Sequence, residues 1–422
     1  MATLPRAKDP YLAFRYKEFT YFIIASFLFT IATLIQEVII GYELYKITHD
    51  PLSIGMIGLA EAVPFIGLSL FGGHLADKLS KKKIIIIAMS CVTFCSLFLH
   101  FYTTDAARST LSLPLLVGGI YAVIFFIGVG KAFLNPAVQA LRAFLIPRAA
   151  YENAATWSSS AWQTGAIVGP ALSGFLYALF GFSNTLLVVV ALLVSSFGLL
   201  LLIKDKPVPA PSKHTDMLQS LKEGLRFVYR TKIILYSISL DLFSVLFGGV
   251  VAILPVFAED ILHVGAEGLG ILRASPSIGA VITLLLLSRY SPMKHVWRNL
   301  LTVVAGFGIC ILVFALSKSM ILSLAALFFS GALDSVSVVI RGTILQLMTP
   351  DELRGRVQAV NGMFLSSSNE LGAFESGFAA KLLGTIPSVL FGGTMTLLVV
   401  GWVYSRTKDL FSVDLTAEHH SS

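Results

Sequence analysis

Long apolar stretches separated by short polar segments run along almost the whole chain. A helix that crosses the ~30 Å hydrocarbon layer of a bilayer needs about 20 mostly apolar residues. Stretches of this kind fall into two sets and predict an all-α membrane protein with twelve transmembrane helices, in two six-helix bundles. The first set is expected near 19–45, 54–76, 83–103, 112–140, 155–179 and 184–203. The second set is expected near 233–258, 267–288, 297–317, 321–347, 358–382 and 387–405.

The longest polar stretch, residues 204–232, separates the two sets. Three prolines prevent a continuous helix through its first part. After Thr215 and Asp216, which are candidate N-caps, apolar residues recur at helical spacing with basic residues between them. This pattern predicts either a basic amphipathic helix on an anionic membrane surface or a solvated linker helix. We therefore divide the chain into an N-terminal bundle (1–203), a cytoplasmic linker (204–232) and a C-terminal bundle with a short tail (233–422).

The composition supports a membrane protein and excludes several other classes. Hydrophobic residues make up 56% of the chain, charged residues only 13%, and the mean hydropathy is +0.81. A soluble domain carries about 25% charged residues, and a disordered chain is far less apolar. Three cysteines cannot form a disulfide framework, and Cys91 and Cys95 lack further ligands for a metal. No Walker loop or nucleophile elbow is present, so we expect neither an enzyme nor a bound cofactor.

The basic residues predict the orientation. With the N-terminus inside, 25 of the 31 Lys and Arg residues fall in the tails, the linker and alternate loops on that side, among them Arg341 in the tenth loop. Four fall on the other side, and Lys131 and Arg273 lie within spans. We expect a bacterial inner-membrane protein with both termini in the cytoplasm and no removable signal peptide. These loops account for the net charge of +7 without a nucleic-acid partner.

The two halves resemble each other at constant offsets, chiefly at glycine and proline, which fix backbone geometry. Two similar halves that face the same way imply a pseudo-two-fold axis along the membrane normal and a substrate site near the midplane. An offset of 203 pairs Gly128 with Gly331, Pro147 with Pro350, Gly169 with Gly372, Gly174 with Gly377, and Lys131 with Asp334. An offset of 212 pairs Pro64 with Pro276, Gly67 with Gly279, and Glu61 with Arg273.

The loop after the second span, GGHLADKLSKKK, resembles the signature loop of the major facilitator superfamily. Ser80 replaces the second glycine of that signature. The resemblance implies a cytoplasmic latch between the two halves in the outward-facing state, with a carboxylate near a helix end and basic partners. A merely positive loop is the alternative. The latch residues expected are Gly73, Leu75, Asp77, Lys78, Lys81 and Lys82, with Arg142 as the cation for Asp77.

The fifth span contains GAIVGPALSG, which resembles the motif of the exporter branches of this superfamily, with Ser173 in place of a glycine. Its characteristic positions are Gly165, Gly169, Pro170 and Gly174. Small residues four apart allow close helix contact, so generic packing is the alternative. Segments near Glu61, Arg273 and residues 342–377 also resemble the branch that contains enterobactin-type siderophore exporters and macrolide-efflux proteins. The arginine that many proton-coupled exporters carry upstream of Gly128 is missing.

Ionisable residues within spans are costly and usually face a cavity or a partner. A buried carboxylate can also bind and release protons near neutral pH. Glu37, with its neighbour Gln36, is the first candidate for substrate or proton coupling, and Asp334 is the second. Glu61 and Arg273 have an alternative role as ion pairs between helices or halves. The candidates are Gln36, Glu37, Glu61, Lys131, Asp241, Arg273 and Asp334, with Glu370 and Glu375 as weaker ones.

The sequence therefore predicts a secondary carrier of the major facilitator type. We expect it to export a small organic compound, of a drug or siderophore type, in exchange for protons, as a monomer in the lipid bilayer. An importer or uniporter of the same fold is one alternative. A non-transporting membrane sensor or assembly factor is another.

Overall fold

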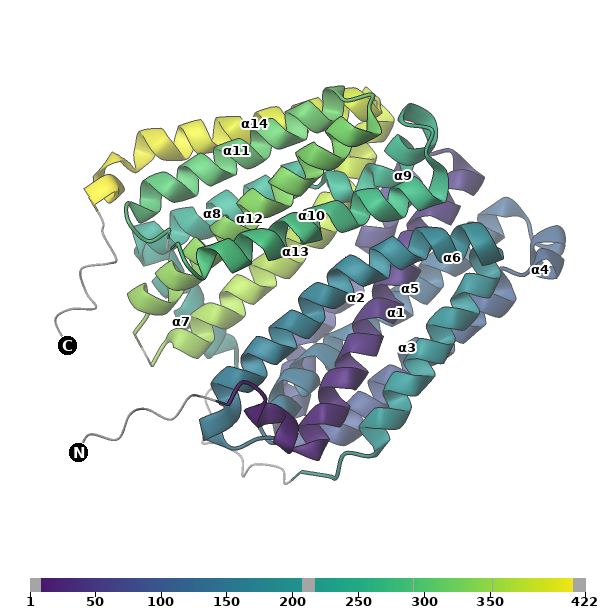
Figure 1. The fold of residues 1–422 in the computed structure, drawn as a ribbon, viewed down its shortest axis with the longest axis horizontal. Helices are drawn as coiled ribbons and strands as arrows, with labels where there is room; N and C mark the ends of the chain where they lie inside the picture. Colours follow the sequence, from purple (N-terminus) through teal and green to yellow (C-terminus); the bar gives the residue numbers. More distant parts are fainter. Residues whose placement is uncertain (1–8, 207–216, 291, 351, 413–422) are drawn as a thin grey trace.

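The computed structural model describes residues 9–206, 217–290, 292–350 and 352–412, and within them every regular element is helical (Figure 1). Short 3₁₀ segments, η1 (Leu12–Arg15) and η5 (Lys408–Ser412), begin and end the described chain. The α-helices of the first half are α1 (Lys17–Thr48), α2 (Pro51–Lys78), α3 (Lys81–Tyr102), α4 (Asp105–Thr110), α5 (Leu113–Arg142) and α6 (Tyr151–Leu201). Then follow α7 (Met217–Arg230), α8 (Lys232–Gly248), α9 (Leu254–Val256), α10 (Gly265–Leu287), α11 (Val296–Leu316), α12 (Met320–Met348), α13 (Arg354–Leu383) and α14 (Thr385–Arg406).

Ten helical segments of the described residues are long and apolar enough to cross a membrane. One of them, α6, contains 51 residues and is broken at Gly181, whose φ of 73° and ψ of 177° lie outside the helical region. The spans predicted near 155–179 and 184–203 lie on either side of this break. Helix α13 is not among the ten, since it carries Glu370, Glu375 and Lys381 together with a polar run at 366–369.

The span predicted near 233–258 is not one continuous helix. Helix α8 ends at Gly248, and the chain continues through η3 (Val250–Ile253), α9 and the π-helical turn η4 (Phe257–Ile261). Pro255 lies at the N-terminal end of α9, where a helix tolerates the missing N–H of proline. The interruption separates Glu259 and Asp260 from the main helix and places them opposite α1.

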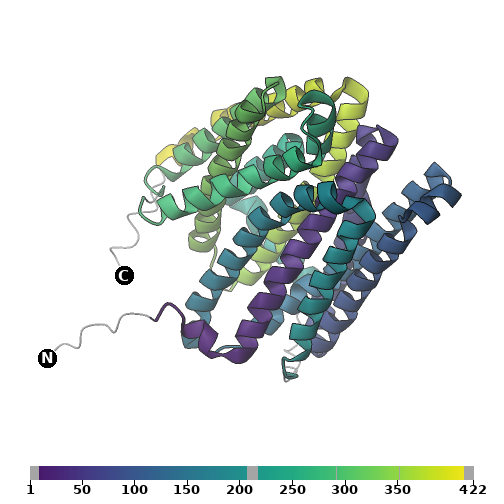
Figure 2. The same ribbon diagram turned by 45° about the vertical axis from the view of Figure 1, so that its right-hand side comes forward.

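Helices of the same half pack against one another in both parts of the chain (Figures 1 and 2). In the first half α1 lies along α6, α2 along α5, and α3 against α5 and α6. In the second half α10 and α11 pack on α12, and α13 and α14 pack on α8. Two contacts join the halves most extensively, α2 with α13 and α6 with α10.

The linker helix α7 docks on the second half. Leu221 and Val228 join the core that α8, α11 and α12 form, and the backbone at Gly224 lies against Arg356 of α13. Arg356 also forms an ion pair with Glu223. The candidate N-caps Thr215 and Asp216 lie outside the described residues. Part of the apolar face of this helix is therefore covered by protein rather than by a membrane surface.

The first and last described elements, η1 and η5, lie at the same end of the long helices (Figure 1), which we call the terminal side. Lys232 Nζ, at the start of α8, donates hydrogen bonds to both carboxylate oxygens of Asp409 in η5, at 2.7 and 2.8 Å. This hydrogen bonding holds the pKa of the Asp409 carboxyl below its ordinary value. The other end of the helices, where α2 begins and α13 ends, is the opposite side.

Candidate functional site

The two halves touch on the opposite side through small residues. A Cβ atom on Gly58 of α2 would lie only 2.6 Å from the carbonyl oxygen of Glu370 on α13, and one on Gly377 would lie 2.7 Å from the Cα of Gly55. A Cβ atom on Gly270 of α10 would lie 2.8 Å from the carbonyl oxygen of Pro170 on α6. Such contacts bring helix backbones together without intervening side chains. The opposite side is therefore tightly closed.

Polar groups reinforce this closure between the halves. Tyr42 of α1 donates a 2.6 Å hydrogen bond to Glu259, and Tyr45 donates one to Asp260. At the outer edge Lys381 Nζ lies 2.6 Å from an oxygen of Asp50. We call Tyr42, Tyr45, Asp50, Glu259, Asp260 and Lys381 the seal residues. The sequence gives no signal for Tyr42 and Tyr45, because a tyrosine within an apolar run does not reveal that it has a partner.

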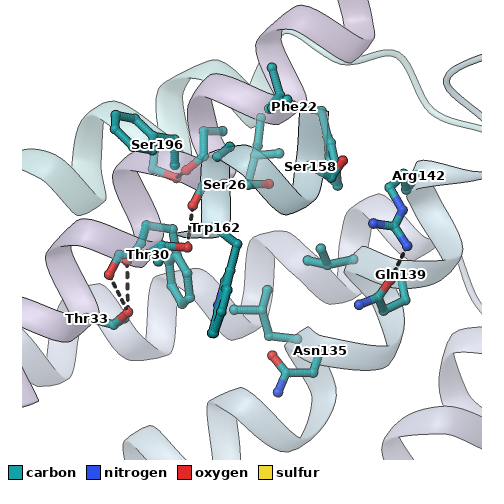
Figure 3. Close-up of a pocket in the computed structure, with 18 of the residues that line it drawn as sticks. Phe22, Ser26, Thr30, Thr33, Asn135, Gln139, Arg142, Ser158, Trp162 and Ser196 are labelled. Atoms are coloured by element: carbon teal, nitrogen blue, oxygen red, sulfur yellow. Dashed lines mark hydrogen bonds between the residues drawn. The ribbon is translucent and has the colours of Figure 1, made fainter. Parts of the chain in front are cut away.

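On the terminal side the halves diverge and leave space between them. A cavity of ≈ 630 Å³ lies between α2, α5, α7 and α13, with Phe65, Pro136 and Met363 in its wall. A second cavity of ≈ 590 Å³ lies within the first half, between α1, α5 and α6 (Figure 3). Asn135 and Gln139 line both cavities. The structure is thus closed on the opposite side and hollowed on the terminal side.

The second cavity combines aromatic rings with neutral polar groups. Trp162 extends into the space beside Asn135 in Figure 3, and the residue is 58% exposed. Ser158 Oγ is buried there and has no hydrogen-bond partner among the described residues. Arg142 is the single charged residue among the described residues of the wall, and it donates to Gln139 Oε1 at 2.7 Å. The other polar residues of the wall are Ser26, Thr30, Thr33, Ser159 and Ser196.

A smaller cavity of ≈ 90 Å³ contains a cluster of five charged residues between the halves. Lys131 Nζ of α5 lies 2.5 Å from Glu61 Oε1 of α2, within the first half. Arg273 of α10 donates from both terminal nitrogens to Glu37 Oε1 of α1, at 3.0 and 2.9 Å. Glu370 of α13 is the fifth member. We call these five residues the charged cluster.

Three carboxylates face two cations in the charged cluster, so an excess negative charge remains when all five are ionised. Arg273 is largely buried, with 12% of its side chain exposed, whereas 45% of Glu37 is exposed. Glu370 has no hydrogen bond or ion pair within the described part of the chain. Removing ionised groups from water is costly unless each has a partner, so this excess charge favours uptake of a proton or a cationic group.

Five of the sequence candidates lie together in the charged cluster: Glu37, Glu61, Lys131, Arg273 and the weaker candidate Glu370. Gln36 does not, because its amide oxygen accepts a 2.7 Å hydrogen bond from Ser96 inside the first half.

Asp241 and Asp334 lie in the second half. Asp241 of α8 forms an ion pair with Arg341, which is buried within α12. The assignment of Arg341 to the tenth loop is therefore wrong, since helix α12 continues to Met348. Asp334 of α12 has no hydrogen bond or ion pair among the described residues, and its side chain is partly buried.

The loop expected to form a latch joins α2 to α3. Gly73 lines the cavity between the halves, and Lys78 is the last residue of α2. Lys81 is buried with its amine 5.5 Å from the ring centre of Phe144, and Lys82 donates to the Leu201 carbonyl at 3.0 Å. The Asp77 side chain lies outside the described residues, so its pairing with Arg142 stays a prediction.

The exporter-type motif of α6 forms helix contacts on two sides. Gly165 and Gly169 lie against Thr30 and Leu34 of α1, while the backbone at Gly174 meets Ala266 of α10. The motif thus contributes both to the packing of the first half and to the contact between halves.

Comparison with known proteins agrees with this architecture. A family model described as a transmembrane secretion effector, of the major facilitator superfamily, matches residues 8–420. The chain belongs to this family. Enterobactin exporter EntS of Shigella flexneri is 26% identical over 385 residues, which cover 90% of this chain and 88% of the relative. EntS of Escherichia coli O1:K1 is 25% identical over the same length and the same shares of the two chains.

Solved structures support the same fold. The nucleoside transporter NupG, in a mutant form, has a TM-score of 0.72 at 15% identity, covering 92% of this chain and 100% of that one. A POT family transporter in complex with 5-aminolevulinic acid has a TM-score of 0.73 at 12% identity, covering 93% and 96%. This major facilitator protein is therefore a secondary transporter of the inner membrane and not an enzyme.

Proposed function

We propose that the protein exports a small organic compound from the cytoplasm in exchange for protons, by alternating access of two six-helix bundles. The observation that carries the proposal is the charged cluster, which joins the halves through Glu37 and Arg273 beside an excess carboxylate. An ion pair between two moving bodies must break in each cycle, so its energy changes with conformation. Groups with this property can couple one movement to another.

The proposed architecture has twelve spans, with bundles at 1–203 and 233–422 and a linker at 204–232. The ten apolar helical segments become twelve when α6 is divided at Gly181 and α13 is added. Helix α13 is long enough to span at 30 residues, and two of its charged residues have surroundings other than lipid: Glu370 lies in the charged cluster, and Lys381 pairs with Asp50 of the first half. An even number of spans then places both termini on one side.

Basic residues concentrate on the terminal side, which favours its assignment to the cytoplasm. The cavities that open there would then receive the cargo from the cytoplasm, and the seal residues would close the path outward. In this interpretation the structure represents an inward-facing state of a monomer.

The wall of the cavity in Figure 3 favours an uncharged or anionic aromatic compound as cargo. Its described residues include Arg142 but no carboxylate to neutralise a cation. The exposed ring of Trp162 and the neutral hydrogen-bonding groups suit a compound with rings and hydroxyl or carbonyl groups. Enterobactin, the compound in the names of the EntS relatives, is the first probe, followed by uncharged and anionic drugs.

Replacing Trp162 with alanine is expected to weaken cargo binding about tenfold, because an exposed aromatic ring in a pocket contributes a large contact area. The measurement is the KM for enterobactin uptake into inverted vesicles. Trp402→Ala is the matched control, since this residue is 52% exposed on α14 outside the cavity. Equal effects of the two substitutions would place the cargo site elsewhere.

Proton coupling is tested in proteoliposomes with an internal pH indicator. Enterobactin transport by the wild type is expected to move protons in the opposite direction. Glu37→Gln, Glu61→Gln and Asp334→Asn should each be compared with Glu352→Gln, at an exposed carboxylate between α12 and α13, and at least one of the three should transport without proton movement. Absence of coupling in the wild type, or full coupling in all three variants, contradicts the proposal. Counterflow without a pH gradient would instead indicate a uniporter or importer.

A further inference from the structure

The two halves carry ion-pair partners at equivalent positions with the charges exchanged. In the first half Glu61 lies on α2 and Lys131 on α5. The offsets of the internal repeat, 212 and 203, place Arg273 on α10 and Asp334 on α12 at the corresponding positions. An acid–base pair in one half thus corresponds to a base–acid pair in the other.

The helix crossings beside these residues are also equivalent. A Cβ atom on Gly128 of α5 would lie 2.9 Å from Pro64 Cγ of α2, and one on Gly331 of α12 would lie 2.6 Å from Pro276 Cα of α10. Glu61 and Arg273 each lie three residues before the proline of their crossing. Lys131 and Asp334 each lie three residues after the glycine. Residues three apart share a helix face, so Arg273 flanks its crossing as Glu61 flanks the other.

The pairing in the structure does not follow this equivalence. Glu61 and Lys131 are bonded within their half, at 2.5 Å. Arg273 instead reaches across to Glu37 of α1, at 2.9 Å. Asp334 has no hydrogen bond or ion pair among the described residues, while the nearby Arg341 is already bonded to Asp241. Asp334 is therefore a carboxylate available to a second cation in its own half.

We propose that Arg273 exchanges its partner during the transport cycle, from Glu37 when the halves are closed on the opposite side to Asp334 when they separate there. Separation of α1 from α10 removes Glu37 from Arg273 and would leave a largely buried guanidinium without a counterion. Asp334 moves with Arg273 because both belong to the second half. The exchange keeps the cation paired in both states and so keeps the two conformations close in free energy.

This inference rests on the proposed alternating access but not on the identity of the cargo or of the coupling ion. Electron–electron distance measurements on spin-labelled protein in lipid nanodiscs test it, without cargo and at one pH. Labels at Ser109 and Ser319 report the opposite side, and labels at Lys83 and Arg289 report the terminal side; all four residues are exposed. The native Cys91, Cys95 and Cys310 are first replaced by serine.

Glu37→Gln removes the partner used in the closed state. We expect it to raise the ratio of opposite-open to opposite-closed protein about tenfold. Adding Asp334→Asn should return the ratio to near its wild-type value, because Arg273 then lacks its partner in the open state. Adding Glu352→Gln instead, at an exposed carboxylate of the second half, should leave the effect of Glu37→Gln intact.

An unchanged ratio in Glu37→Gln, or a double variant as open as Glu37→Gln alone, would overturn the exchange. Gly58→Val provides a second background if Glu37→Gln does not fold, because it disfavours the closed state sterically. There too, Asp334→Asn should lower the opposite-open population. Failure of these distance measurements would leave proton-coupled export intact, and failure of the transport assays would leave the exchange intact.

Discussion

Replacement of Lys131 by methionine is expected to abolish transport and to destabilise the protein more than any other single substitution in the charged cluster. The ammonium group lies 2.5 Å from Glu61 and close to two further carboxylates, Glu37 and Glu370. Without it, three acidic groups would face Arg273 alone. Breaking a buried ion pair by removing one partner costs about 3–5 kcal/mol, because the remaining charge is left uncompensated.

The double variant Lys131→Met/Glu61→Met separates the cost of the unpaired charge from the role of the pair. Removing both members of a buried pair is often nearly neutral for stability, so the double variant should recover most of the thermal stability lost in Lys131→Met. Lys318→Met, at an exposed lysine outside the cluster, should leave stability and transport unchanged. Unfolding of purified protein in detergent and enterobactin uptake into inverted vesicles provide the two measurements. A Lys131→Met variant as stable as the wild type would contradict the pairing seen in the structure.

Gly58→Val is expected to force the halves apart on the opposite side. A Cβ atom at this position would lie 2.6 Å from the Glu370 carbonyl oxygen and 2.8 Å from Ala373 Cβ, and valine adds two further methyl groups. Overpacking of such a contact costs about 1–3 kcal/mol, a factor of about 5–150 in the population of the closed state. The open state does not bear this cost, because its helices no longer touch there.

Gly67 supplies the matched control on the same helix, since a Cβ atom there would meet no described residue within 4 Å. Gly67→Val should therefore leave the distance distribution between labels at Ser109 and Ser319 unchanged, whereas Gly58→Val should lengthen it. Transport by Gly58→Val should fall accordingly, because the cycle must pass through the closed state. Equal distributions in the two variants would show that the close approach of α2 and α13 does not control the conformation.

Much of the candidate site could be predicted from the sequence because charges inside apolar helices are rare. Glu37, Glu61, Lys131 and Arg273 were identified on that basis, and all four lie in the charged cluster. Gln36 was identified on the same basis but is bonded to Ser96 inside the first half. Adjacent residues on a helix point in directions about 100° apart, so only one of the two neighbours can face the cavity.

Other features were not accessible from the sequence. Tyr42 and Tyr45 lie within an apolar helix, and only their contacts with Glu259 and Asp260 distinguish them from core aromatics. Arg341 was counted with the tenth loop although the span predicted near 321–347 contains it, because a count of basic residues by loop does not locate the end of a helix. Its burial against Asp241 shows that helix α12 continues past it.

The sequence by itself determined that this is a membrane transporter of the major facilitator type, with its internal repeat and its intramembrane charges. Membrane thickness fixes the length of each apolar stretch, and glycine and proline mark close helix contacts. Both features are therefore visible in the order of residues alone. Only the tertiary structure decided which charge pairs with which, that Arg273 reaches across to Glu37 while Asp334 remains unpaired within the described chain, and that the opposite side is closed. Ion pairs depend on separations of a few ångströms between residues that lie far apart in the sequence, 236 positions for Glu37 and Arg273, and helix packing alone sets those separations.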